Sequence, residues 1–101
     1  MTRALHKSAT YRADVVDAAE FGLEQFGARV CDAFLDSLAN TERLIAEFPQ
    51  IGTSLNFGAT ERNVRRPVIG SYNLIYFVQS DNVVLLRLIR QEREDQTLTT
   101  L

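Results

Sequence analysis

Arginine is the residue type in the second half of this chain that is best suited to chemistry. Residues 52–101 contain six arginines and neither a histidine nor a lysine. A guanidinium group is permanently charged, so it stabilises anions well but carries protons poorly. The six arginines fall near predicted strand ends and in the C-terminal segment, and four of them are our candidate binding residues: Arg65, Arg87, Arg90 and Arg93. If they converge on one side of a sheet, they form a positive patch on an otherwise acidic protein.

Other chemically useful side chains are few. His6 is the only histidine and Lys7 the only lysine, and both fall in a predicted N-terminal strand. Proton transfer in catalysis needs a positioned acid and base, and a lone histidine supplies no such pair, so we predict no catalytic residues. One cysteine, Cys31, and one histidine cannot supply the four ligands of a zinc site. We therefore expect no metal and no cofactor.

Composition and charge limit the class of protein. The chain has 101 residues, of which 46% are hydrophobic and 24% are charged, and this length and composition are typical of one globular domain. Its formal net charge of −2 argues against a dedicated nucleic-acid binder, because such proteins are usually basic. Residues 1–51 carry eight acidic and five basic side chains, whereas residues 52–101 carry five acidic side chains and six arginines. The two halves are therefore expected to face different partners or different solvent. Without a long apolar stretch or a signal sequence, we expect a cytoplasmic protein with no membrane partner.

Residues 8–48 have the periodicity of helices. One apolar stripe recurs at intervals of three and four residues, which is the spacing of one helix face: Val30, Phe34, Leu38, Thr41, Ile45 and Phe48. A second stripe precedes it: Val15 or Val16, Ala19, Leu23 and Phe26. Gly27 stands between the stripes and predicts two antiparallel helices joined there, with Ser8 or Thr10 as the first cap. One continuous helix is the competing interpretation, but it would expose both stripes at once.

The period then changes to that of strands. Tyr72–Val78 alternates in the manner of a strand, and Ser80–Asn82 is typical of a hairpin loop. Val83–Ile89 is apolar except at Arg87, which predicts a central strand covered on both faces. Three further segments complete the pattern: a strand over Arg3–Lys7, a loop over Thr53–Glu61, and a strand over Asn63–Ile69 that Pro67 confines to an edge or a bulge.

These elements predict an α+β fold. An N-terminal strand is followed by an antiparallel helical hairpin, which packs on an antiparallel sheet that ends in a three-stranded meander. We expect a single domain over residues 1–101, with residues 92–101 as a frayed tail. Arg87 has two open interpretations. It either has a structural role, by pairing with an acidic residue of the helices or capping helix carbonyls, or contributes to a functional surface.

Several motifs in this order resemble the ParE/RelE superfamily, the toxins of bacterial type II toxin–antitoxin modules. The similarity runs from Ser8 to Asp95 and is carried by Phe48-Pro49-x-x-Gly52, Arg65, Tyr72-x-Leu74-x-Tyr76-x-Val78 and Leu85-Leu86-Arg87-Leu88-Ile89. The chain is more similar to the ParE branch, which has long paired helices. Arg90 stands where family members often carry histidine, and Arg93-Glu94 where they often carry Arg-Asp.

The resemblance implies a toxin that inhibits DNA gyrase by binding and is neutralised by a cognate ParD-like antitoxin in a hetero-oligomer. We expect the antitoxin to lay an apolar helix across the helical hairpin and to add an extended segment along a sheet edge. The alternatives are a RelE-type ribosome-dependent mRNA endonuclease, or an attenuated relative that binds an antitoxin without being toxic. Cleaving RNA requires a base, an acid and a cation, and the side chains of this sequence favour binding over such catalysis.

Overall fold

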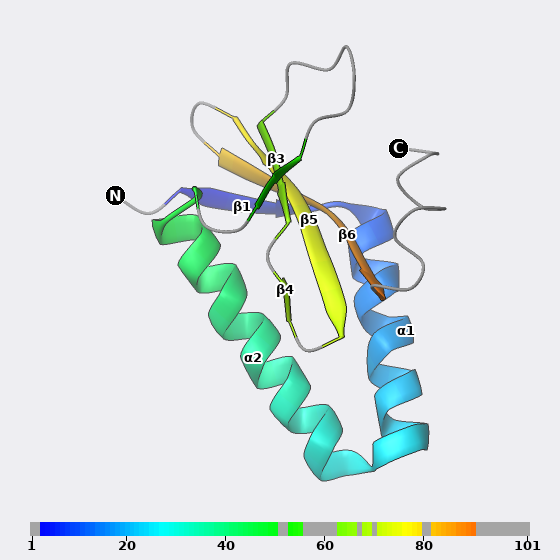
Figure 1. Cartoon of the computed structure of the whole chain (residues 1–101). Helices are drawn as coiled ribbons and strands as arrows, with labels where there is room; N and C mark the ends of the chain where they lie inside the picture. The colour runs from blue at the N-terminus through cyan, green and yellow to red at the C-terminus, as the bar shows by residue number, and fades with distance from the viewer. Residues whose placement is uncertain are drawn as a thin grey trace.

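The computed structural model describes residues 3–50, 53–55, 63–66, 68–69, 71–79 and 82–90, with side chains over 3–50, 71–79 and 82–90. The described elements follow one another as β1 (Ala4–Lys7), α1 (Ala9–Phe26), α2 (Ala28–Glu47), β2 (Thr53–Leu55), β3 (Asn63–Arg66), β4 (Val68–Ile69), β5 (Tyr72–Val78) and β6 (Asn82–Arg90). The predicted α+β fold is confirmed: the paired helices lie against a sheet, and the turn that joins them lies beyond the ends of β5 and β6 (Figure 1).

The helical hairpin forms where the sequence predicts it. Ser8 is the N-cap of α1, and its hydroxyl accepts a hydrogen bond from the Tyr11 N–H at 3.0 Å. Gly27 separates the helices with a φ of 87° and a ψ of 173°, a conformation that is almost confined to glycine. The α2 helix ends at Glu47, next to the predicted boundary before Pro49.

The buried face of α1 differs from the predicted one. The predicted stripe is confirmed only at its start: Val15 packs against the main core, whereas Val16, Leu23 and Phe26 are more than half exposed. Tyr11 and Ala18 are buried instead, and lie on one helix face. The last turns of α1 extend beyond the ends of β5 and β6 (Figure 1), and the apolar residues Leu23 and Phe26 of the last turns are exposed.

The stripe of α2 is confirmed in its middle and wrong at its ends. Leu38 and Ile45 are buried in the main core, and Phe34 packs against it. Val30 and Phe48, at the two ends of the stripe, are each at least half exposed. The core therefore lies under the central turns of α2.

The sheet is mixed rather than wholly antiparallel. Its strand order is β1-β6-β5-β3-β2, and β4 pairs with β5. The β1 strand pairs with β6 in parallel, whereas the other described pairs are antiparallel. The Arg3 N–H donates to the Ala46 carbonyl at 2.9 Å, so α2 returns the chain to the start of β1. The antiparallel strands that follow then bring β6 alongside β1 in the same direction.

Two strand assignments change. Thr53–Leu55 forms β2 rather than part of a loop, because it pairs with β3; the rest of the predicted loop lies outside the described residues. The segment Asn63–Ile69 forms two strands, β3 and β4, and β3 is an inner strand rather than an edge. Residue 67, the middle of the hairpin loop (residues 80–81) and the tail from residue 91 onward also lie outside the described residues.

Strands β5 and β6 carry apolar residues on both faces. Leu74 and Tyr76 join the core under the helices, whereas Ile75 and Phe77 form a second buried cluster with Ile89. This alternation follows from the two-residue period of a strand. The β6 strand lies between β1 and β5, as predicted, and is thus the element that positions Arg87 and Arg90.

Candidate functional site

An ion pair between α1 and β6 organises the candidate site. Arg87 Nε lies 2.7 Å from Asp14 Oδ2, and Arg87 donates a second hydrogen bond to Asp14 Oδ1 at 3.1 Å. Such two-point contacts between guanidinium and carboxylate are directional and strong. The side chains of Arg87 and Asp14 are only 24% and 13% exposed. The structural interpretation of Arg87, pairing with an acidic helix residue, is therefore confirmed.

The same carboxylate also closes an open edge of the sheet. The β1 strand covers β6 only as far as Leu85. Beyond that point, the Ser8 hydroxyl donates to the Leu86 carbonyl at 3.0 Å, and the Leu88 N–H donates to Asp14 Oδ2 at 2.9 Å. Side chains at the start of α1 thus replace the missing strand, and they satisfy backbone groups that would otherwise need a partner.

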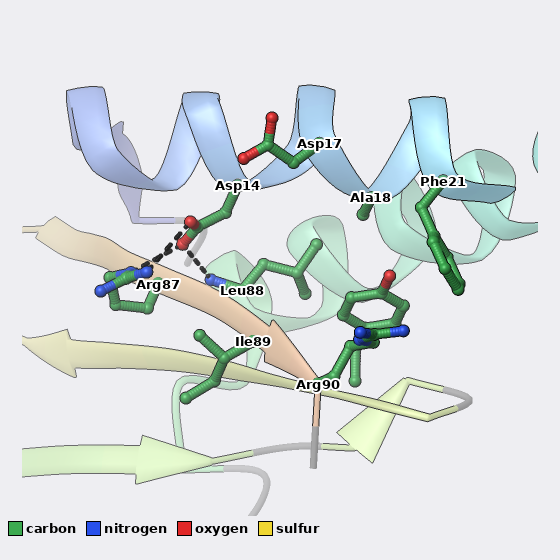
Figure 2. A pocket seen from close by; sticks show the side chains of 9 residues that line it. Asp14, Asp17, Ala18, Phe21, Arg87, Leu88, Ile89 and Arg90 are labelled. Carbon is green, nitrogen blue, oxygen red and sulfur yellow. Dashed lines mark hydrogen bonds and ion pairs between the residues drawn. The ribbon is translucent and has the colours of Figure 1, made fainter. Parts of the chain in front are cut away.

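Arg90 lies further along β6, against an aromatic ring. Its guanidinium carbon is 4.5 Å from the centroid of the Phe21 ring, within the range of a cation–π contact. Phe21 projects from α1 toward the strand that carries Arg90 (Figure 2). This contact links the end of β6 to α1 at Arg90.

A cleft of about 420 Å³ connects the two arginines. It runs between α1 and the end of β6 and is lined by Asp14, Asp17, Ala18, Phe21, Tyr72, Arg87, Leu88, Ile89 and Arg90 (Figure 2). The Asp14 carboxylate pairs with Arg87, and the guanidinium of Arg90 lies against the Phe21 ring. The cleft thus places two guanidinium groups beside apolar side chains, a combination that suits the binding of an anionic or aromatic group.

The structure brings together two of the four predicted binding residues. Arg87 and Arg90 share the cleft. Arg65 belongs to β3 and pairs through its backbone with Tyr76 and Ser54, so two strand spacings separate it from β6; its side chain is not among those described. Arg93 lies outside the described residues, and its part in a patch stays a prediction.

Sequence reasoning missed the α1 residues of the cleft. Asp14, Ala18 and Phe21 are spaced by four and three residues, so they lie on the helix face that Tyr11 begins. A carboxylate on a face that contains buried residues needs a partner. That signal points to Asp14, but the sequence does not say which arginine it meets.

A second polar network lies outside the cleft and joins β1, α1 and α2. The Tyr11 hydroxyl donates to Glu42 Oε2 at 2.6 Å, and Lys7 Nζ lies 3.2 Å from Glu42 Oε1. Burial raises the pKa of Tyr11 well above its ordinary value, and the hydrogen bond to Glu42 raises it further. Tyr11 thus stays protonated and links α1 to α2, while the only lysine of the chain is paired outside the cleft.

Two observations concern metals and membranes. Among the described residues, no group of three or more His, Cys, Asp or Glu side chains is placed to hold a metal ion. In the same part of the chain, neither helix is both long enough and apolar enough to span a membrane.

Comparison with solved structures shows which fold the chain shares. A chain titled as a chromosomal ParDE system from P. aeruginosa has a TM-score of 0.70 at 12% identity, covering 88% of this chain and 96% of that one. A toxin–antitoxin complex, RelBE, from Mycobacterium tuberculosis has a TM-score of 0.58 at 18% identity, covering 90% and 100%. A copper-bound mutant toxin from Helicobacter pylori has a TM-score of 0.53 at 21% identity, covering 90% and 97%. These likenesses establish the fold.

Sequence comparison establishes the family. No curated protein matches the chain. Residues 5–95, however, match the family described as "ParE toxin of type II toxin-antitoxin system, parDE". This range agrees with the extent of the resemblance seen in the sequence. The chain therefore belongs to the ParE toxin family of type II toxin–antitoxin systems.

Proposed function

We propose that this ParE-family toxin acts in the cytoplasm and inhibits DNA gyrase by binding it rather than by chemistry of its own. A cognate ParD-like antitoxin neutralises it in a hetero-oligomeric complex. Arg90 contributes to the surface that meets an acidic region of gyrase or its bound DNA. Arg87 lies in the same cleft, and Arg65 and Arg93 are further candidates for this surface.

The observation that supports this proposal most directly is the composition of the cleft. Among the described residues that line it, the cations are two arginines, and none is histidine, the side chain best suited to moving protons near neutrality. His6 lies in β1, and Lys7 is paired with Glu42. Asp14 accepts hydrogen bonds from Arg87 and from the Leu88 N–H, which leaves it poorly placed to act as a base.

A RelE-type endonuclease is the second candidate, because the fold is also shared with a RelBE toxin at a TM-score of 0.58. Purified toxin should be added to a gyrase supercoiling reaction and, in parallel, to a translation reaction with a defined message. Inhibited supercoiling with accumulation of cleaved plasmid supports the proposal. Message cut only in the presence of ribosomes would transfer the function to the second candidate. Inactivity in both assays, together with antitoxin binding, would indicate an attenuated relative.

Variants locate the target surface. The Arg90→Ala/Arg93→Ala double variant should fold, still bind antitoxin, and lose most of its gyrase inhibition. Arg43→Ala is the matched control, because Arg43 is an exposed arginine on α2, where it donates to Asn40. A folded double variant with full gyrase inhibition would place the target surface elsewhere.

A further inference from the structure

Phe21 lies outside the hydrophobic core although it is one of the largest apolar residues of α1. It belongs to neither of the two buried clusters formed by the described residues, and it is not among the partly buried residues that pack against them. Phe21 is 36% exposed. Replacing its ring by another apolar side chain should therefore cost the core little, and the contacts that this ring makes lie elsewhere.

The ring of Phe21 contacts a cation and a second ring. The guanidinium carbon of Arg90 lies over the ring, 4.5 Å from its centroid. The ring of Phe26 meets it in a T-shaped arrangement, with the centroids 6.3 Å apart and the planes at 78°. Both geometries are attractive, because the face of an aromatic ring is negative and its edge is positive. The contact with Phe26 thus supports the orientation of the ring that Arg90 meets.

The α1 helix contacts both arginines of the cleft, by two different kinds of interaction. Asp14 and Phe21 are seven residues apart and lie on one helix face, opposite Arg87 and Arg90 of β6 (Figure 2). Asp14 forms an ion pair with Arg87, whereas Phe21 meets Arg90 through its ring. A phenyl ring attracts a guanidinium but has no net charge. The contact with Phe21 therefore orients Arg90 and does not itself reduce its charge.

We propose that Phe21 is the positioning residue of Arg90, and that its ring holds the guanidinium in the cleft in the orientation that meets an anionic group of the target. A free arginine side chain has many rotamers, and binding must restrict them. Orienting the side chain before the encounter lowers that cost. The proposal rests on the proposed function for what Arg90 binds, whereas the contact that holds Arg90 is independent of the target.

The first test measures the concentration of toxin variants that half-inhibits gyrase supercoiling. Phe21→Leu keeps an apolar side chain but removes the ring, and should raise this concentration about threefold to tenfold, the range of a cation–π contact. Phe21→Tyr keeps a ring and should stay within about twofold of wild type. Phe48→Leu is the matched control, because Phe48 is 58% exposed at the end of α2 and does not line the cleft. It should also stay within about twofold.

A ring-fluorinated phenylalanine at position 21 separates cation binding from apolar contact. Fluorine withdraws electrons from the ring face, so it weakens the attraction for a guanidinium, and it makes the ring more hydrophobic. If Phe21 positions Arg90, the fluorinated toxin should inhibit gyrase about threefold less well than wild type. If Phe21 instead contacts the target directly as an apolar anchor, the fluorinated toxin should inhibit as well as wild type or better, and that result would overturn the proposal.

Nuclear magnetic resonance tests the contact in the free toxin. The Nε–H resonance of Arg90, identified by its loss in Arg90→Lys, should move to higher frequency in Phe21→Leu, because the ring current of Phe21 lowers the frequency of nuclei over its face. An unchanged resonance, or full gyrase inhibition by folded Phe21→Leu, would overturn the proposal. Absence of gyrase inhibition by wild type would refute the proposed target, and the resonance of Arg90 would then decide by itself whether Phe21 positions this side chain.

Discussion

Removal of Asp14 should destabilise the fold more than removal of its partner Arg87. The side chains of this pair are partly buried, at 13% and 24% exposed. Breaking a fully buried pair costs about 3–5 kcal/mol, whereas exposed pairs contribute about 0.2–1 kcal/mol. We therefore expect Arg87→Ala to lower the free energy of unfolding by about 2 kcal/mol.

The additional loss for Asp14 comes from the Leu88 N–H. Its hydrogen bond to Asp14 Oδ2, at 2.9 Å, is lost in Asp14→Ala but kept in Arg87→Ala. An unsatisfied buried donor costs about 1–3 kcal/mol, so Asp14→Ala should cost about 3 kcal/mol in total. Because both single variants break the same ion pair, the double variant should cost about 1–2 kcal/mol less than the sum of the two.

Urea unfolding followed by circular dichroism measures all of these values. The denaturant slope shows whether each variant still unfolds in one comparable step. Asp17→Ala is the control, since Asp17 is an exposed carboxylate of the same cleft, and it should stay within about 0.5 kcal/mol of wild type. Equal costs for Asp14→Ala and Arg87→Ala would refute the role assigned to the Leu88 hydrogen bond. Additive costs would refute the coupling of the pair.

Three further predictions concern the helices. Leu38→Ala should cost about 2–5 kcal/mol in urea unfolding because Leu38 is buried, whereas Leu44→Ala, at a 48% exposed position, should change stability by less than about 0.5 kcal/mol. Tyr11→Phe leaves Glu42 without its hydroxyl donor and should lower the melting temperature at pH 7. The folded state raises the pKa of Tyr11, so this deficit is fully present below the unfolded value of about 10. It should shrink as the pH rises above that value, and an unchanged deficit at pH 11 would contradict this reasoning. Gly27→Ala should cost about 1–3 kcal/mol by thermal melting because of its φ of 87°; a more stable variant would show that the turn relaxes freely.

The sequence was informative where local patterns decide the structure. Gly27 separates two apolar stripes, and the alternation from Tyr72 to Val78 has the period of a strand, so the helical hairpin and β5 could be predicted. The face of α1 that is buried could not be predicted in the same way. The pattern predicts a buried face on the premise that apolar residues face the core, but Leu23 and Phe26 are more than half exposed in the last turns of α1, which extend beyond the ends of β5 and β6.

Local sequence patterns also could not predict which distant segments of the chain pair with each other. The sequence indicated that Arg87 needs a partner or solvent, but Asp14 lies 73 residues away along the chain. The parallel alignment of β1 with β6 and the pairing of β2 with β3 likewise depend on how the whole chain returns on itself. Local periodicity contains no information about these contacts. The sequence therefore predicted candidate residues for the site, but it did not predict which residues contact them in the fold.

The three hydrogen bonds at Asp14 also limit how this protein can diverge. Two come from Arg87, a side chain that substitution can replace, and one comes from the Leu88 N–H, which every residue except proline provides. Exchanging the charges of the pair would place a cation at position 14 and leave that N–H facing another donor. Divergent descendants can therefore lose the arginine at position 87 first and keep the acceptor at position 14. The reverse order passes through an intermediate with an unpaired cation and an unpaired backbone donor. We therefore expect substitutions at position 87 to precede substitutions at position 14 during the evolution of this protein.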